Sequence, residues 1–465
     1  MAPPLVPKDE LYGLRNAIAG GVVAPGDVDY DEARAVWNGM VERQPVAVVS
    51  AAHAGDIAPT IRFARDHGLD LAVRGGGHNV AGNGTVDGGI VLDLGDLRSV
   101  TVDPPAATVK VEAGATLADI DAATEPAGLV VPIGVVSSTG IAGLTLGGGV
   151  GWLTRAHGLT ADNLVSVELV TANGEQVTAS ESEHAELFWA LHGGGGNFGV
   201  VTAFTFRAYP HGPQLFAGNL VYTQDRWPQA WAAFEEWTRD LPEAMTSITT
   251  TLTPPPVLEM GDQPLLLIGF AWASPDHAAG NSVVQRLRDL APPDDEEVGE
   301  TRWVEWQSAV DALFPKGSRA YWRNTSFDRL DEDVVEVLVR RGSEQTWTGT
   351  GFDVHHMGGA YGRVPEDATP FPNRAARFWL NIYGFWDDAA HDEDRIAFVR
   401  GVSGDMDAFA TGGQYVNFQG HERAGHRVLD PRTVFGPAKY ERLVAVKRRY
   451  DPDNLFHVNH NIPPR

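Results

Sequence analysis

Residues 71–84 read LAVRGGGHNVAGNG, an apolar run that leads into three consecutive glycines and a histidine. The run 69–73 is apolar apart from Asp70, which predicts a strand that ends at the glycines. Glycines let successive N–H groups turn toward one anion, so the stretch is a candidate phosphate cradle. It fits neither the Rossmann pattern nor the Walker loop, which needs Gly-Lys-Ser/Thr. On spacing alone, a tight loop with an incidental histidine is the equal alternative.

Two further glycine runs follow. Residues 134–151 read GVVSSTGIAGLTLGGGVG, and residues 193–199 read GGGGNFG. A single run is weak support for a binding site, because glycine also serves tight turns. Three runs within about 130 residues favour one extended cofactor that passes several loops, over a purely structural explanation.

The order of predicted elements indicates an α+β chain of two domains. Residues 1–205 alternate short strands and helices, with a hairpin at Asn173-Gly174 between strands at 164–170 and 176–179 and a helix at 183–191. Residues 206–405 predict an antiparallel sheet with helices on one face, and the tail 406–465 is expected to return to the first domain. The strands of the second domain are expected at 247–253, 265–273, 347–357 and 378–385, its helices at 227–241, 280–290 and 332–341, and an acidic loop at 294–297.

Composition excludes several classes of protein. The 465 residues carry 36 Lys and Arg against 61 Asp and Glu, a net charge of −25, which argues against nucleic-acid and membrane-surface partners. Cysteine is absent, so disulfides, thiolate metal sites and cysteine nucleophiles are excluded. His421, His457 and His460 lack metal-ligand spacing, and no metal is expected. Neither a secretory signal nor a membrane-length apolar run is visible, so the expected location is the cytoplasm.

Several strings together resemble one known family. The chain is similar to the FAD-linked oxidases of the vanillyl-alcohol oxidase and para-cresol methylhydroxylase superfamily, in the bacterial berberine-bridge-enzyme-like branch. The resemblance implies a two-domain PCMH-type fold, with FAD bound by 1–205 and 406–465 and a substrate-binding domain at 206–405. The matching strings follow the family order over nearly the whole chain and include VRGGGHNVAGNG (73–84), GVVSSTGIAGLTLGGGVGWLTRAHGLTADNL (134–164), LFWALHGGGGNFGVVTAF (187–204), GGAYGRVPEDATPFPNR (358–374) and YDPDNLFHVNHNIPP (450–464).

The resemblance makes His78 the attachment point of FAD, through an 8α-N-histidyl bond. A neutral imidazole is a nucleophile near pH 7, which agrees with this role. The cysteinyl bond that many members add at the position of Val136 is impossible in a chain without cysteine. The other cofactor contacts implied by the resemblance are Arg74, Gly75, Gly76, Gly77, Asn79, Gly82, Thr139, Gly140, Gly143, Gly148, Gly149, Gly151, Asn163, Val201, Tyr415, Asn417 and Asn459.

The resemblance also places an acid–base residue on the predicted strand 347–357. Alternation along that strand puts Asp353 and His355 on one face and His356 on the other. Tyr415 is a further candidate base and Tyr361 a weaker one, and the choice among them stays open. Thr139, with Leu144 nearby, matches the place where the family controls access of dioxygen to the flavin. The aromatic residues expected either in the core or around a substrate pocket are Tyr321, Trp322, Trp347, Phe352, Trp379 and Tyr383.

The expected activity follows from these assignments. A base would take a proton from a substrate hydroxyl or activated carbon while hydride passes to flavin N5. Dioxygen would reoxidise the flavin and give H2O2, so the expected partners are a small-molecule substrate and dioxygen. The alternatives are a dehydrogenase with another electron acceptor, a flavin N5-oxide oxygenase, and a flavin-holding protein without catalysis.

Overall fold

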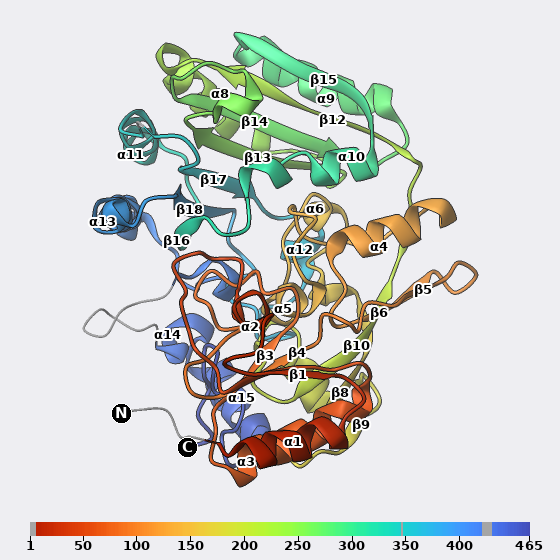
Figure 1. Cartoon of the computed structure of the whole chain (residues 1–465). Helices are drawn as coiled ribbons and strands as arrows, with labels where there is room; N and C mark the ends of the chain where they lie inside the picture. The colour runs from red at the N-terminus through yellow and green to blue at the C-terminus, as the bar shows by residue number, and fades with distance from the viewer. Residues whose placement is uncertain (1–5, 346, 421–429) are drawn as a thin grey trace.

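The computed structural model describes residues 6–345, 347–420 and 430–465, so His421 lies outside the described residues. Figure 1 shows two units stacked on each other. The first unit contains small sheets from the N-terminal part of the chain together with the C-terminal helices. The second unit is built on one large sheet with helices on its outer side.

Two sheets form the centre of the first unit. In the four-stranded sheet, β3 runs parallel to β4 and ends where the first glycine run begins. In the five-stranded sheet every pairing is antiparallel, and β8 and β9 form the hairpin predicted at Asn173-Gly174. The strands, in sheet order, are β1 (Gly21–Val23), β2 (Ala47–Ser50), β4 (Ile90–Asp93) and β3 (Leu71–Arg74), then β5 (Val100–Asp103), β6 (Thr108–Glu112), β10 (Val200–Arg207), β8 (Leu164–Val170) and β9 (Gln176–Ser180). A short pair joins β7 (Leu129–Val130) to β11 (Tyr209–Pro210).

The second unit contains a seven-stranded antiparallel sheet. Alternate residues of its strands, such as Phe352 and Val354, pack against the helices α8, α9, α11 and α13. The residues between them, including Asp353 and His355, face the first unit. The fold is therefore the predicted α+β arrangement with helices on one face of an antiparallel sheet. In sheet order the strands are β15 (Asp295–Arg302), β12 (Gln214–Tyr222), β14 (Leu265–Trp272), β13 (Met245–Leu252), β17 (Gly351–His356), β18 (Phe378–Trp386) and β16 (Arg319–Phe327).

The C-terminal tail packs into the core of the first unit. Leu443, Phe456 and Ile462 are buried in the same apolar cluster as strands β2, β4 and β10. A fully buried ion pair, Lys447 with Asp451, ties this tail to the third glycine run, because the Lys447 ammonium also donates to the carbonyl of Asn197 at 2.8 Å. The tail therefore helps to fix a loop that lies far away in the sequence.

The α-helices in the described part of the chain are mostly short. They are α1 (Lys8–Ala17), α2 (Tyr30–Arg34), α3 (Ile57–Asp66), α4 (Leu117–Thr124), α5 (Ile141–Gly147), α6 (Thr154–His157), α7 (Ala185–Ala190), α8 (Trp227–Thr238), α9 (His277–Leu290), α10 (Trp303–Ser308), α11 (Glu332–Ser343), α12 (Ala360–Arg363), α13 (Asp392–Met406), α14 (Pro431–Phe435) and α15 (Pro437–Tyr450). None of them is long and apolar enough to cross a membrane.

The acidic run 294–297 was predicted as a loop, and this prediction is wrong. Residues from Asp295 onward form β15, an edge strand that pairs with β12 along its length. Its side chains are mostly exposed, and acidic residues on an edge strand discourage pairing with other chains. Several other boundaries differ from prediction by a few residues; helix α8, for example, ends at Thr238 and not at 241. Helix α9 begins at His277 because Asp276 caps it, and β17 begins at Gly351 because Gly349 has a φ of +81° that ends the preceding turn.

Candidate active site

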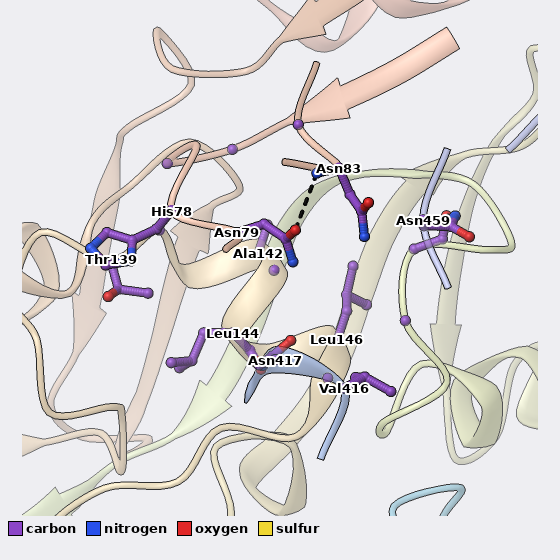
Figure 2. Close-up of a pocket in the computed structure, with 18 of the residues that line it drawn as sticks. His78, Asn79, Asn83, Thr139, Ala142, Leu144, Leu146, Val416, Asn417 and Asn459 are labelled. Atoms are coloured by element: carbon purple, nitrogen blue, oxygen red, sulfur yellow. Dashed lines mark hydrogen bonds between the residues drawn. The ribbon is translucent and has the colours of Figure 1, made fainter. Parts of the chain in front are cut away.

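A long pocket runs along the junction between the two units. It is lined by the loop that follows β3, the loop before α5, α5 itself, residues 194–199, the tail 456–460, and strands β16, β17 and β18. Figure 2 shows His78 and Thr139 at one end of the pocket, Asn459 at the other, and α5 between them. The three glycine runs, which are distant in sequence, therefore line one continuous cavity.

Two glycines show that the cavity suits an extended ligand. Gly143 and Gly196 both line the pocket, and a Cβ added at either would meet no protein atom within 4 Å. The absence of side chains at these positions leaves space on the pocket side, as close approach of a cofactor requires. The residues present therefore fit an FAD-sized group.

Other glycines are required by packing within the protein. A Cβ on Gly76 would lie 2.5 Å from the amide nitrogen of Gly140, so these two backbones touch each other at the pocket wall. Gly82, Gly148, Gly149 and Gly151 do not line the pocket, although the resemblance placed them at the cofactor. A Cβ on Gly82 would clash with the Val41 side chain, and one on Gly148 with the Phe371 side chain. A Cβ on Gly149 would clash with the Thr160 side chain, and one on Gly151 with the carbonyl of Ile133.

Two polar residues expected at the cofactor are engaged within the protein. The Arg74 guanidinium lies at the pocket wall but donates to Asp93 at 2.6 Å and to the carbonyl of Ala33 at 2.6 Å. The charge of Arg74 is thus already paired within the protein. The backbone N–H groups around Arg74 are therefore the candidate phosphate cradle. Asn163 lies outside the pocket, where its amide donates to two carbonyls and its oxygen accepts from the Tyr209 hydroxyl at 2.6 Å.

His78 lies at the end of the pocket where the two units meet. Its ring stacks on Trp37 with centroids 4.6 Å apart, and its buried Nε2 has no hydrogen-bond partner among the described residues. Burial lowers the pKa of His78 to about 4, so the imidazole is neutral at physiological pH. A neutral, unpartnered ring nitrogen in a cavity is a competent nucleophile.

Asp353 lines the same pocket from β17. Its carboxylate accepts the Tyr383 hydroxyl at 3.0 Å, and Asn381 lies directly opposite it on β18. Burial raises the pKa of Asp353 to about 7, against the opposing effect of hydrogen bonds from Thr250, Tyr383 and Asn381. A carboxyl group with this pKa exchanges a proton near neutral pH.

His355 is the next pocket residue on β17. Both of its ring nitrogens are buried without a partner among the described residues, and burial lowers the pKa of His355 to about 4. His356 lies outside the pocket and packs near Phe378 in the direction of the helices, as alternation predicted. The neutral His355 ring can therefore offer one donor and one acceptor to a ligand.

An aromatic wall connects His78 to this polar group. Trp322 lies 6.1 Å from Trp37 and 5.9 Å from Phe418, and Phe418 lies 5.9 Å from His355, all between ring centroids. The indole Nε1 of Trp322 and the side-chain oxygen of Asn381 are also buried without a partner in the described part of the chain. This end of the pocket thus presents apolar rings and several free donors and acceptors.

Tyr415, a further candidate base, also lines the pocket. Its hydroxyl oxygen accepts the amide N–H groups of Gly149 at 3.1 Å and Asn417 at 3.0 Å. Burial raises the pKa of Tyr415 to about 12. Tyr361 does not line the pocket and donates its hydroxyl to the carbonyl of Asn373 at 2.7 Å.

Most of the remaining site residues predicted from the sequence line the pocket. These are Gly75, Gly77, Asn79, Thr139, Leu144, Val201, Asn417 and Asn459, together with Val136. Of the six aromatic residues singled out above, Trp322 lines it. Phe314, Asn381 and Phe418 also line the pocket but were not predicted, because their place depends on tertiary packing. No group of three or more His, Asp or Glu residues in the described ranges could hold a metal ion.

Comparisons with known proteins identify relatives of this chain in sequence and in fold. The family described as FAD binding domain matches residues 45–180, and the family described as Berberine and berberine like matches 414–463. The FAD-linked oxidoreductase pgmH of Aspergillus terreus is 31% identical over 97% of this chain and 95% of its own. The crystal structure of 6-hydroxy-D-nicotine oxidase from Arthrobacter nicotinovorans superposes with a TM-score of 0.83 at 26% identity, covering 96% of this chain and 98% of that one.

A further solved structure shares the fold. Glucooligosaccharide oxidase from Acremonium strictum, described as carrying a 6-S-cysteinyl, 8α-N1-histidyl FAD, has a TM-score of 0.85 at 20% identity, covering 98% of this chain and 99% of that one. Fold and pocket thus define an FAD-dependent oxidoreductase with a PCMH-type fold. The chain belongs to the FAD-linked oxidoreductases of the berberine-bridge-enzyme-like family.

Proposed function

We propose that the protein carries FAD on His78 through a single 8α-N-histidyl bond and oxidises a hydroxyl group or activated C–H bond of a small organic molecule, with dioxygen as electron acceptor. The observation that carries the proposal is that one pocket is lined by the unpartnered His78 nitrogen together with Asp353 and His355. The names of the nicotine and glucooligosaccharide oxidases support the choice of oxidase, and the histidyl FAD of the second supports the linkage.

Within this proposal the residues have distinct roles. Asp353 takes the proton from the substrate, because a base acts best when its pKa lies near the working pH. Tyr383 orients that carboxylate, while His355 and Asn381 hydrogen-bond the substrate. When bound, FAD would supply the hydride acceptor, and its reoxidation by dioxygen would give H2O2. Thr139 and Leu144, which both line the pocket, control the access of dioxygen to the flavin.

The proposed cofactor site is smaller than the sequence implied. It consists of the backbone of residues 74–79, residues Gly140, Gly143, Gly196 and Val201, and the side chains of Asn417 and Asn459. We also propose that residues 1–205 and 406–465 form the FAD-binding domain and 206–405 the substrate-binding domain. The shared core of the tail and the N-terminal sheets supports this division.

Acid precipitation of the purified protein tests the linkage. We expect the flavin bands to remain with the pellet in the wild type and to move to the supernatant in His78→Ala. His53→Ala, at an exposed histidine outside the pocket, is the matched control and should resemble the wild type. Yellow colour that stays with the His78→Ala pellet would refute the attachment site.

Anaerobic mixing with candidate substrates tests the reaction. A substrate should bleach the flavin, and admission of air should restore its colour with one H2O2 per substrate. If an electron-accepting dye restores the flavin colour and air does not, the protein is a dehydrogenase instead.

A further inference from the structure

One short segment of the second unit reaches the first unit beside His78. We call residues 303–314 the bridging segment; it comprises α10, the 3-10 turn Asp311–Leu313 and Phe314. The Trp303 indole donates to the carboxylate of Asp121 on α4 at 2.8 Å, in a buried contact. Phe314, at the other end of the segment, lines the pocket.

The bridging segment holds the loop that precedes α5. We call residues 134–140 the pocket loop, and five of its residues, Gly134, Val135, Val136, Thr139 and Gly140, line the cavity. The Gln307 side chain donates to the carbonyl of Gly134 at 2.7 Å. The carboxylate of Asp311 accepts the backbone N–H of Ser137 at 2.8 Å and also the Ser137 hydroxyl. Asp311 thus bonds the residue that lies between two pocket-lining positions.

The same segment supports His78 from its other side. The carbonyl of Phe314 accepts the indole N–H of Trp37 at 3.1 Å, and Trp37 is the residue that stacks on His78. Trp37 also donates its backbone N–H to the carbonyl of Gly77 at 3.0 Å. The His78 ring and the pocket loop are therefore both fixed by contacts with one stretch of the second unit.

We propose that Asp311 is a positioning residue for covalent attachment of FAD: by holding Ser137 it keeps the pocket loop, with Val136 and Thr139, in the place that directs the flavin's methyl group toward His78. This inference rests on the proposed histidyl linkage. In the attachment reaction a His78 nitrogen bonds to the 8α carbon, and the nitrogen and the methyl group each lose one proton. The two electrons enter the flavin and then reduce dioxygen, which takes both protons as H2O2.

Geometry makes this reaction sensitive to the loop. Bond formation requires the reacting atoms to lie about 3 to 3.5 Å apart, and a displacement of about 1 Å costs on the order of 10²-fold in rate. Asp311→Ala removes both acceptors from Ser137 and leaves the Gln307 contact with Gly134 in place, so the loop loses its anchor at Ser137. Asp311→Asn keeps a carbonyl oxygen for the Ser137 N–H, at the same length of side chain, and so should keep the loop in place.

The test compares FAD attachment in these two variants with the wild type. Each purified protein is measured for total flavin and for acid-stable flavin, at fixed times after FAD is supplied. We expect Asp311→Ala to keep its total flavin but to attach it at least about tenfold more slowly, and Asp311→Asn to stay within about threefold of the wild type. Asp276→Ala is the matched control, because it also removes a carboxylate from a backbone N–H, at 3.0 Å, but lies outside the pocket.

Three results would overturn the inference. Attachment at the wild-type rate in Asp311→Ala would show that the loop needs no such anchor. Equal losses in Asp311→Ala and Asp311→Asn would assign the effect to charge rather than to position. Loss of total flavin in parallel with acid-stable flavin would assign a general structural role to Asp311. A wild type without acid-stable flavin would refute the proposed linkage itself, and this result is distinct from the other three.

Discussion

Replacement of Asp353 by asparagine should lower activity and raise stability. The variant keeps the size of the side chain but cannot accept a proton, and loss of a general base costs on the order of 10² to 10⁴-fold in rate. In the wild type, only the carboxylate form can act as the base. With a pKa of about 7, its kcat/KM should rise about tenfold per pH unit below pH 7 and level off above it.

The effect on stability has the opposite sign. Burial raises the pKa of Asp353 from 3.8 to about 7, so the folded protein favours the protonated carboxyl. That contribution is complete below pH 3.8 and is lost as the pH rises through about 7. A difference of about three pKa units corresponds to about 4 kcal/mol at pH 8, which we reduce to about 2 kcal/mol because the carboxyl opens into the pocket. Asp353→Asn, neutral at every pH, should therefore unfold with a free energy about 2 kcal/mol higher at pH 8.

Two assays on the same samples check both effects. Anaerobic stopped-flow reduction of the flavin from pH 5 to pH 9 gives the rate, and urea unfolding at pH 4 and pH 8 gives the free energy. Asp276→Asn, at an exposed helix cap that asparagine serves equally well, is the control and should change neither. A wild-type profile that is flat through pH 7, or a variant less stable than the wild type at pH 8, would refute this reasoning.

Three other substitutions probe separate parts of the site. Gly143→Val should lower FAD affinity at least about tenfold, measured by flavin content and titration, because the new side chain would occupy the cavity that faces the open side of Gly143. Lys447→Met leaves the fully buried Asp451 without its partner and should cost about 3 to 5 kcal/mol in urea unfolding. Tyr415→Phe should reduce the rate of flavin reduction less than about tenfold, since burial raises the pKa of Tyr415 to about 12, far above the working pH; a loss as large as that of Asp353→Asn would make Tyr415 the base.

The cofactor end of the site could be predicted because its signals are local. Consecutive glycines beside His78 and again at 193–196 are typical of places where a backbone or a ligand comes close. Their density along the chain predicted a cofactor site. Local pattern could not tell which glycines face the ligand. Gly143 faces open space, whereas Gly151 would clash with the carbonyl of Ile133, and the two are indistinguishable in the sequence.

Around Asp353, only part of the candidate site could be predicted from the sequence. Alternation along β17 placed Asp353 and His355 together, because that period is a property of one strand. Asn381 reaches the same group through its pairing with Asp353 across β17 and β18, and the register of two strands far apart in the sequence cannot be derived from either alone. The edge strand β15 was missed because its exposed acidic side chains lack the apolar alternation by which a half-buried strand is recognised.

The division of the site between two units has a consequence for the order of assembly. His78 and the glycine runs belong to the first unit, but Trp37 and the pocket loop are held by Phe314 and Asp311 of the second. The first unit can supply the cavity, yet the contacts that fix the geometry around the His78 nitrogen exist only when both units are docked. If FAD is attached to His78 as proposed, attachment should follow docking of the two units. Only a completed site would then receive a covalently bound cofactor.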